Sequence, residues 1–199
     1  KFINFMIMRI LHLKNLIILI IILFSFYLIS PYHKIYKLYN SIKKSDTEFV
    51  SKNIDWVNVK SGFKDDFKNI VNKAYSQTNS LEKKILGNLF IQIIIETLVD
   101  NLVTPKNLIL LVNDPDKYKD LIEDKLENPI KKINYIQKIN YEEKDFRVKY
   151  AFFININKFR VSFIKEDYPI SIDFKINSFK WKLNRIYLPV DIIASKINN

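Results

Sequence analysis

Residues 146–183, which read FRVKYAFFININKFRVSFIKEDYPISIDFKINSFKWKL, decide the fold. Apolar and polar side chains alternate along four short segments of this stretch, and short polar connections separate the segments. A period of two is typical of strands that bury one face, so the pattern predicts an antiparallel meander. Residues 135–141 are a candidate fifth strand at the edge. The side chains predicted to face the core are Phe146, Val148, Tyr150, Phe152, Phe159, Val161, Phe163, Ile170, Ile172, Phe174, Ile176, Phe179, Trp181 and Leu183.

The residues before the sheet have helical periodicity instead. Asp46 is predicted to cap a short helix that ends near Lys52, and Asp55 is predicted to cap the next helix. That second helix has one apolar stripe at the spacing of helical turns, made of Val59, Phe63, Phe67, Ile70 and Ala74. Helices followed by strands predict an α+β domain, in which a helical layer over 32–132 covers one face of a four- to five-stranded sheet over 133–189.

The segment Leu81–Val103 is predicted to form a long, buried helix. Three of its four i+4 rows are largely apolar, so neighbouring elements should cover most of its surface. The fourth row is polar and is predicted to face water; its members are Asn88, Gln92, Glu96 and Asp100.

Three shorter segments complete the pattern. Thr104 and Pro105 are the residue types of a helix cap and a first helical position, and they predict a short helix over 107–112. Residues 116–132 are charged and are predicted to form an irregular connection, and 114–145 as a whole is left without assigned structure. Residues 190–197 are predicted to form a short terminal helix.

Residues 1–31 are predicted to form a membrane anchor. The run Leu16–Ile29 is apolar except for Ser25, and counting from 10 to 31 gives enough length for a helix that spans a bilayer. Bulky residues occupy 26–29, where a signal peptidase needs small ones, so we expect an uncleaved anchor; a removed signal peptide is the alternative. Arg9 and Lys14 precede the run, which predicts a cytoplasmic N-terminus and a single extracytoplasmic domain over 32–199.

Composition excludes several classes of enzyme. The chain of 199 residues contains no Cys and two Gly, so zinc ribbons, iron–sulfur clusters, thiol catalysis and glycine-rich phosphate loops cannot be built. The formal net charge is +11, but no nucleic-acid-binding motif accompanies it, and we predict no nucleic-acid partner. Both histidines, His12 and His33, lie beside the apolar run. We therefore predict no catalytic residue, no cofactor and no metal site.

Two carboxylates and two tryptophans remain as candidates for a ligand or partner face. Glu96 and Asp100 lie one turn apart on one helical face, as an acid–base or metal-binding pair requires; the alternative is the water-facing edge of a buried helix. Trp56 and Trp181 either pack in the core or form the aromatic wall of a cleft between sheet and helices.

Four parts of the sequence carry a resemblance to a known family. They are SPYHKIYKLYNSIKKSD with VSKNIDWVNVKSGFK (30–46 and 50–64), TLVDNLVTPKNLILLV (97–112), NKFRVSF (157–163) and FKWKLNRIYLP (179–189). In this order they resemble the bacterial family called domain of unknown function 2939, although Asn157 stands where Asp is commoner. The resemblance spans most of residues 30–189, without 114–145. It implies a bacterial envelope protein of unknown activity and supplies no catalytic residues.

Two functions remain as predictions. The first is a non-enzymatic binding or assembly module, held at the bacterial inner membrane by residues 10–31, with an envelope protein or a lipid as its partner. The alternative is a carrier of a lipid or another small apolar ligand, which would bind between the sheet and the helices. A hydrolase that uses Glu96 and Asp100 is a third hypothesis. The sequence leaves the oligomeric state open.

Overall fold

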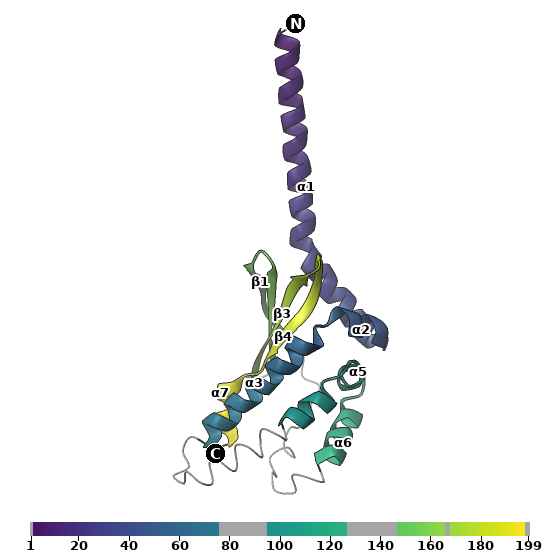
Figure 1. The fold of residues 1–199 in the computed structure, drawn as a ribbon, viewed down its shortest axis with the longest axis vertical. Coiled ribbons are helices and arrows are strands. Elements are labelled where there is room, and N and C mark those ends of the chain that lie inside the picture. Colours follow the sequence, from purple (N-terminus) through teal and green to yellow (C-terminus); the bar gives the residue numbers. More distant parts are fainter. Residues whose placement is uncertain (1, 76–94, 127–146, 166–167, 198–199) are drawn as a thin grey trace. The chain divides into compact units, whose positions relative to one another are not determined.

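The computed structural model describes residues 2–75, 95–126, 147–165 and 168–197 of the chain. The chain divides into two compact units, Lys1–Lys37 and Leu38–Asn199. The first unit is helical, and the second contains several helices and a four-stranded antiparallel sheet (Figure 1). The predicted α+β fold is therefore confirmed.

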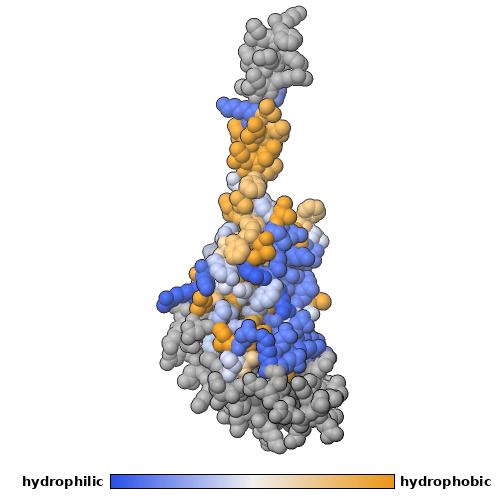
Figure 2. Space-filling model, turned by 90° about the vertical axis from the view of Figure 1, so that its left-hand side faces the viewer, coloured by the Kyte–Doolittle hydropathy of each residue, from blue (hydrophilic) through white to orange (hydrophobic). Residues whose placement is uncertain are grey.

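Most of the first unit is the helix α1, which runs from Phe2 to Lys43. Its apolar side chains form a continuous band (Figure 2). Pro31 lies inside the helix and has no N–H to donate to the carbonyl of Tyr27. The Ser30 hydroxyl donates to this carbonyl instead, at 2.7 Å. The helix thus continues past the proline to Lys43.

Two capped helices follow, α2 (Thr47–Asn53) and α3 (Trp56–Tyr75). The Asp46 carboxylate accepts a hydrogen bond from the Phe49 N–H at 2.9 Å. The Asp55 carboxylate accepts one from the Asn58 N–H at 3.3 Å. Each carboxylate satisfies an N–H that the first helical turn leaves without a partner, so both predicted helix starts are confirmed.

The buried face of α3 differs in part from the predicted stripe. Phe67 is 39% exposed, and the side chain of residue 74 lies outside the described part of the chain. The buried residues of α3 are spaced three or four positions apart and include a glycine and a carboxylate. They are Val59, Gly62, Asp66 and Ile70. The prediction was wrong here because a stripe of apolar residues alone could not reveal that a polar contact, described below, occupies the middle of this face.

The described chain resumes with a helical segment at 95–102. Ile95 and Val99 are buried, whereas Glu96 and Asp100 are exposed, as the predicted rows require. The rest of the predicted helix, with Asn88 and Gln92, lies outside the described residues. Helix α5 (Pro105–Asn113) follows, and the Thr104 hydroxyl accepts a hydrogen bond from the Asn107 N–H at 3.2 Å.

The prediction of an irregular connection after α5 was wrong. Helix α6 occupies Pro115–Leu126. The Asp114 carboxylate accepts a hydrogen bond from the Lys117 N–H at 3.1 Å, and Pro115 takes the first helical position. This is the same arrangement as Thr104 with Pro105, and it starts a helix for the same reason. The high charge of the segment concealed this signal, although Lys and Glu are good helix formers on an exposed surface.

The sheet has four strands, and each neighbour in the order β1-β2-β3-β4 is antiparallel. This is the predicted meander; residues 135–141, the candidate fifth strand, lie outside the described residues. The C-terminal helix α7 (Val190–Ile197) confirms the last predicted element. The bounds of the strands are Arg147–Asn155 for β1, Lys158–Lys165 for β2, Tyr168–Asn177 for β3 and Lys180–Tyr187 for β4.

One face of the sheet contributes to the core. The predicted inward rows of β2, β3 and β4 are confirmed by the buried residues Phe159, Val161, Phe174, Trp181 and Leu183.

Two parts of the predicted core are wrong. In β1, Val148, Tyr150 and Phe152 are exposed, whereas Ala151 and Phe153 pair with Val161 and Phe159 on the core face. Both faces of this strand carry apolar or aromatic side chains, so the alternation does not show which face is buried. A register shift between Val148 and Tyr150 also interrupts the alternation. Phe179 lies in the β3–β4 turn and is fully exposed.

Candidate functional site: the polar face of the sheet

The carboxylates singled out from the sequence form ion pairs with α3. The Asp100 carboxylate lies 2.8 Å from Lys64 Nζ and 3.7 Å from Lys60 Nζ. Glu96 lies 3.7 Å from Lys68 Nζ. The hydrogen bond from Lys64 lowers the pKa of Asp100 against the opposing effect of desolvation. The two carboxylates thus link the helical segment 95–102 to α3 on an exposed surface, which is the water-facing alternative named above.

The two tryptophans occupy different environments. Trp181 is buried on the core face of β4, where its ring lies 6.0 Å from that of Phe153 in an edge-to-face arrangement. Trp56 begins α3 and is half-buried, and its indole N–H donates to the Ser51 carbonyl at 3.1 Å. Trp181 therefore has the packing role that was one of its two predicted readings, and Trp56 ties α3 to α2.

The other face of the sheet carries an ordered set of polar and aromatic side chains, which we name the polar sheet face. Residues that pair across neighbouring antiparallel strands point to the same side, so the register defines rows that cross the sheet. Three such rows are formed by Tyr150, Ser162, Ser171 and Tyr187; by Phe152, Arg160, Asp173 and Arg185; and by Lys158, Lys175 and Lys182.

Asp173 is the centre of the polar sheet face, and its exposed fraction is 0%. Arg160 holds the carboxylate with two hydrogen bonds, from Nε at 2.6 Å and from Nη2 at 2.9 Å. Lys158 Nζ lies 2.8 Å from Oδ2, and the Tyr187 hydroxyl donates to the same oxygen at 2.9 Å. A buried carboxylate needs such donors, because the loss of water would otherwise cost several kcal/mol.

The protonation of this cluster follows from its hydrogen bonds. Burial raises the pKa of Asp173, but the bonds from Arg160, Lys158 and Tyr187 lower it more, so the pKa lies below its ordinary value. The bond to Asp173 likewise raises the pKa of Lys158. Asp173 is therefore a charged anchor for two cations.

Tyr187 and Arg185 connect the cluster to α3. The guanidinium carbons of Arg160 and Arg185 lie 4.7 and 5.1 Å from the centre of the Tyr187 ring, in the range of cation–π contacts. Arg185 Nη2 donates to Asp66 at 2.6 Å. A Cβ at Gly62 would overlap the Arg185 side chain. Because Gly62 has no side chain, the Arg185 side chain can pass across α3 at this position.

On β1 and the adjacent strands, the polar sheet face offers aromatic and hydroxyl groups. Tyr150 and Phe152 are exposed, and their ring centres lie 5.1 Å apart. Hydrogen bonds with Ser162 and Ser171 lower the pKa of Tyr150, and the two serine hydroxyls lie 3.2 Å from each other. Exposed rings beside arginines and hydroxyls suit the binding of a planar or anionic group.

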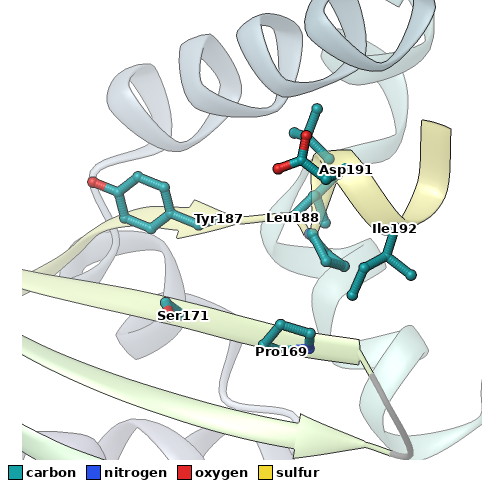
Figure 3. A pocket seen from close by; sticks show the side chains of 8 residues that line it. Pro169, Ser171, Tyr187, Leu188, Asp191 and Ile192 are labelled. Atoms are coloured by element: carbon teal, nitrogen blue, oxygen red, sulfur yellow. The ribbon is translucent and has the colours of Figure 1, made fainter. Parts of the chain in front are cut away.

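A pocket of about 310 Å³ continues the polar sheet face toward α7. In Figure 3, Ser171 and Pro169 lie on β3, and Tyr187 lies at the end of β4. Leu188 lies just before α7, and Asp191 and Ile192 lie in its first turn. Pro169, Leu188 and Ile192 make this pocket partly apolar. Glu96, Asp100 and the two tryptophans do not line it.

The polar sheet face was missed at the sequence level, although a signal for it exists. Arg160 and Asp173 each occupy the polar half of a period-two segment. The predicted hairpin brings both to one face of adjacent strands, where an opposite-charge pair is favourable. In the sequence, the polar residues of these strands were used only to identify the apolar residues that alternate with them. Among the residues that the structure describes, no group of three His, Asp or Glu side chains could hold a metal ion.

The fold and these sites define an α+β domain joined to an apolar N-terminal helix. In the described ranges, one helix is long and apolar enough to cross a membrane, at His12–Lys43. Residues 20–111 match the family described as "Protein of unknown function (DUF2939)", so the family predicted from the sequence is confirmed over these residues. The motifs at 157–163 and 179–189 lie outside the matched range. No curated protein and no solved structure matches the chain at a significant level.

Proposed function

We propose that the protein is a single-pass protein of the bacterial inner membrane, whose extracytoplasmic domain is a non-enzymatic binding or assembly module. The observation that carries the proposal is α1. Its most apolar window has a mean hydropathy of 2.3, and none of that window is buried against the rest of the chain. Such a surface is stable in lipid and unstable in water.

The gain from insertion can be estimated from composition. Twelve residues of the run Leu16–Ile29 are Leu, Ile or Phe, and each contributes about −0.3 to −0.6 kcal/mol at the centre of a membrane helix. Their sum, about −4 to −7 kcal/mol, favours a membrane span. Two arginines in this run would cost about 5–7 kcal/mol and cancel the gain.

The role as a binding module is supported by the polar sheet face. Both of its arginines are held by buried carboxylates: Arg160 by Asp173 in the same face, and Arg185 by Asp66 on α3. This rigidity suits recognition of a partner, because ordered side chains lose little entropy on binding. The exposed rings of Tyr150 and Phe152 provide contact area beside the arginines.

The anchor and its orientation are tested together by fusing C-terminal reporters that are active on only one side of the membrane. We expect activity from the extracytoplasmic reporter, and retention of the full-length chain in membranes after alkaline extraction. The variant Ile20→Arg/Leu23→Arg should release the chain from the membrane. Activity of the cytoplasmic reporter alone, or a soluble chain shortened at its N-terminus, would refute the proposal.

A second candidate function, a carrier of a lipid or small apolar ligand, is favoured by the pocket of about 310 Å³. This volume is at the lower end of known ligand pockets. Native mass spectrometry of the detergent-purified chain should then detect a bound small molecule, and Ile192→Trp should displace it by filling the pocket. A chain that carries no small molecule excludes the carrier function and leaves the binding module.

A further inference from the structure

Both two-residue hairpin turns that the structure describes lie at one end of the sheet (Figure 1). The β1–β2 turn joins Asn155 to Lys158, and the β3–β4 turn joins Asn177 to Lys180. The two turns are neighbours, because the Ile176 N–H donates to the Asn157 carbonyl at 2.9 Å. We name residues 154–158 and 175–182 the hairpin end.

Two large apolar side chains project from the hairpin end. Ile156 is 80% exposed and Phe179 is fully exposed. Phe179 also has an unfavourable backbone conformation, since Ser178 and Phe179 have φ values of 49° and 60°. A turn with two such residues is normally occupied by Asn and Gly, and a bulky side chain with positive φ is strained. The folded domain by itself thus gains nothing from a phenylalanine here.

The surroundings of these side chains are basic. Residues 154–163 and 174–183 contain four lysines, one arginine and no Asp or Glu. Lys158, Lys175 and Lys182 share one row across three strands, and Lys180 adjoins Phe179 in the turn. The nearest acid in sequence, Asp173, is fully buried and pairs with Arg160 and Lys158. Lys175, Lys180 and Lys182 therefore supply the positive charge of the hairpin end. The hairpin end therefore presents apolar tips surrounded by cationic groups.

We propose that the hairpin end binds an anionic phospholipid surface, with Ile156 and Phe179 inserted at the headgroup boundary and the lysines at the phosphates. Apolar side chains combined with lysines are what interfacial membrane binding requires. A protein partner fits less well, because a stable protein interface buries about 1,200 Å² or more around an apolar centre, whereas here two separate tips project from a cationic surface. The proposal deepens the proposed function and rests on its membrane location.

Attachment of the domain to the membrane allows even weak lipid contacts to form. Once α1 holds the chain in a bilayer, the hairpin end meets lipid at a high local concentration, so a small surface is sufficient. The lipid contact would limit the orientations in which the polar sheet face meets its partner.

A fluorescence experiment on the full chain tests this inference directly. Because the chain has no Cys, Ser178→Cys provides a single labelling site next to Phe179 that keeps the phenylalanine. An environment-sensitive dye at this site is measured in nanodiscs of mixed phosphatidylglycerol and phosphatidylcholine. We expect a blue-shifted emission and several-fold stronger quenching by a lipid-attached nitroxide than by a water-soluble quencher. Asn69→Cys, exposed on α3, is the matched control and should show the opposite preference.

Two further variants separate lipid binding from other effects. Phe179→Asn introduces a residue that the turn prefers, so the domain should fold, and lipid quenching at residue 178 should fall several-fold. For the Ser178→Cys chain that retains Phe179, lipid quenching should be weaker in nanodiscs of phosphatidylcholine alone. If the chain is anchored in the discs but the dye at 178 behaves like the dye at 69, the inference fails and the anchor stands. If the chain does not enter the discs, the proposed function fails. Protection of residue 178 by a protein partner, without lipid quenching, also overturns the inference.

Discussion

Substitution of Arg160 by methionine should destabilise the domain more than any change of an exposed cation. Arg160→Met keeps an unbranched apolar stem but removes two hydrogen bonds, at 2.6 and 2.9 Å, from a carboxylate with no exposed surface. Breaking a buried ion pair from one side costs about 3–5 kcal/mol. Lys158 and Tyr187 still donate to Asp173, so we expect the lower end, about 3 kcal/mol.

The double variant Arg160→Met/Asp173→Leu distinguishes the charge from simple loss of packing. It removes the buried charge together with Arg160, and the partly exposed Lys158 can be solvated by water instead; such replacements are often close to neutral. The double variant should therefore be more stable than Arg160→Met and lie within about 1 kcal/mol of the natural chain. Lys175→Met, an exposed member of the same face, is the control and should change stability by less than about 0.5 kcal/mol.

Urea unfolding of the full chain in detergent, followed by tryptophan fluorescence, measures these differences. Trp181 is buried on the core face and reports on the sheet. If Arg160→Met costs no more than Lys175→Met, or if the double variant is less stable than the single one, Asp173 is not a buried charge held by Arg160 and the description of the polar sheet face is wrong.

Three further predictions concern acid stability, the α3–β4 contact and α6. Because the pKa of Asp173 is lowered in the folded state, its stabilisation is present above the unfolded pKa and is lost as the pH falls through the folded value; unfolding titrations should show the natural chain losing its advantage over Arg160→Met below about pH 4. Gly62→Ala in a helix would ordinarily stabilise, but its Cβ overlaps Arg185, so thermal unfolding should show a loss of about 1–3 kcal/mol; an increase in stability contradicts the contact. Asp114→Ala removes the cap of α6 and should cost about 1 kcal/mol and increase hydrogen exchange in α6 alone; unchanged exchange argues against the cap.

The architecture was predictable where local rules act strongly. Asp46 and Asp55 are good caps in front of amphipathic segments, and the alternation in β2, β3 and β4 sets a hydrophobic row against a polar row. These predictions depend only on residues that are close together in the sequence. In β1 both rows contain aromatic and aliphatic residues, so the period of two is clear but the face that it buries is not. The pairing of Phe153 with Phe159, a tertiary fact, decides it.

The candidate site was less predictable, since long-range contacts create it. Glu96 and Asp100 are conspicuous as a pair, but only the placement of Lys60, Lys64 and Lys68 on the neighbouring helix makes them structural. Asp66 shows the same limit: it is one charged residue among several on α3, and its burial depends on Arg185, which lies 119 positions further along the chain. Such contacts cannot be deduced from spacing in one segment.

The proposed function requires that α1 hold the domain at the outer side of the cytoplasmic membrane. A single-cysteine chain, Asn69→Cys, measures this directly in bacterial cells whose outer barrier has been permeabilised, with a maleimide that cannot cross the cytoplasmic membrane. We expect residue 69 to be labelled while the cytoplasmic membrane is intact, and the labelled chain to be recovered in membranes. Labelling only after lysis, or a labelled chain found in solution, would refute the proposed function.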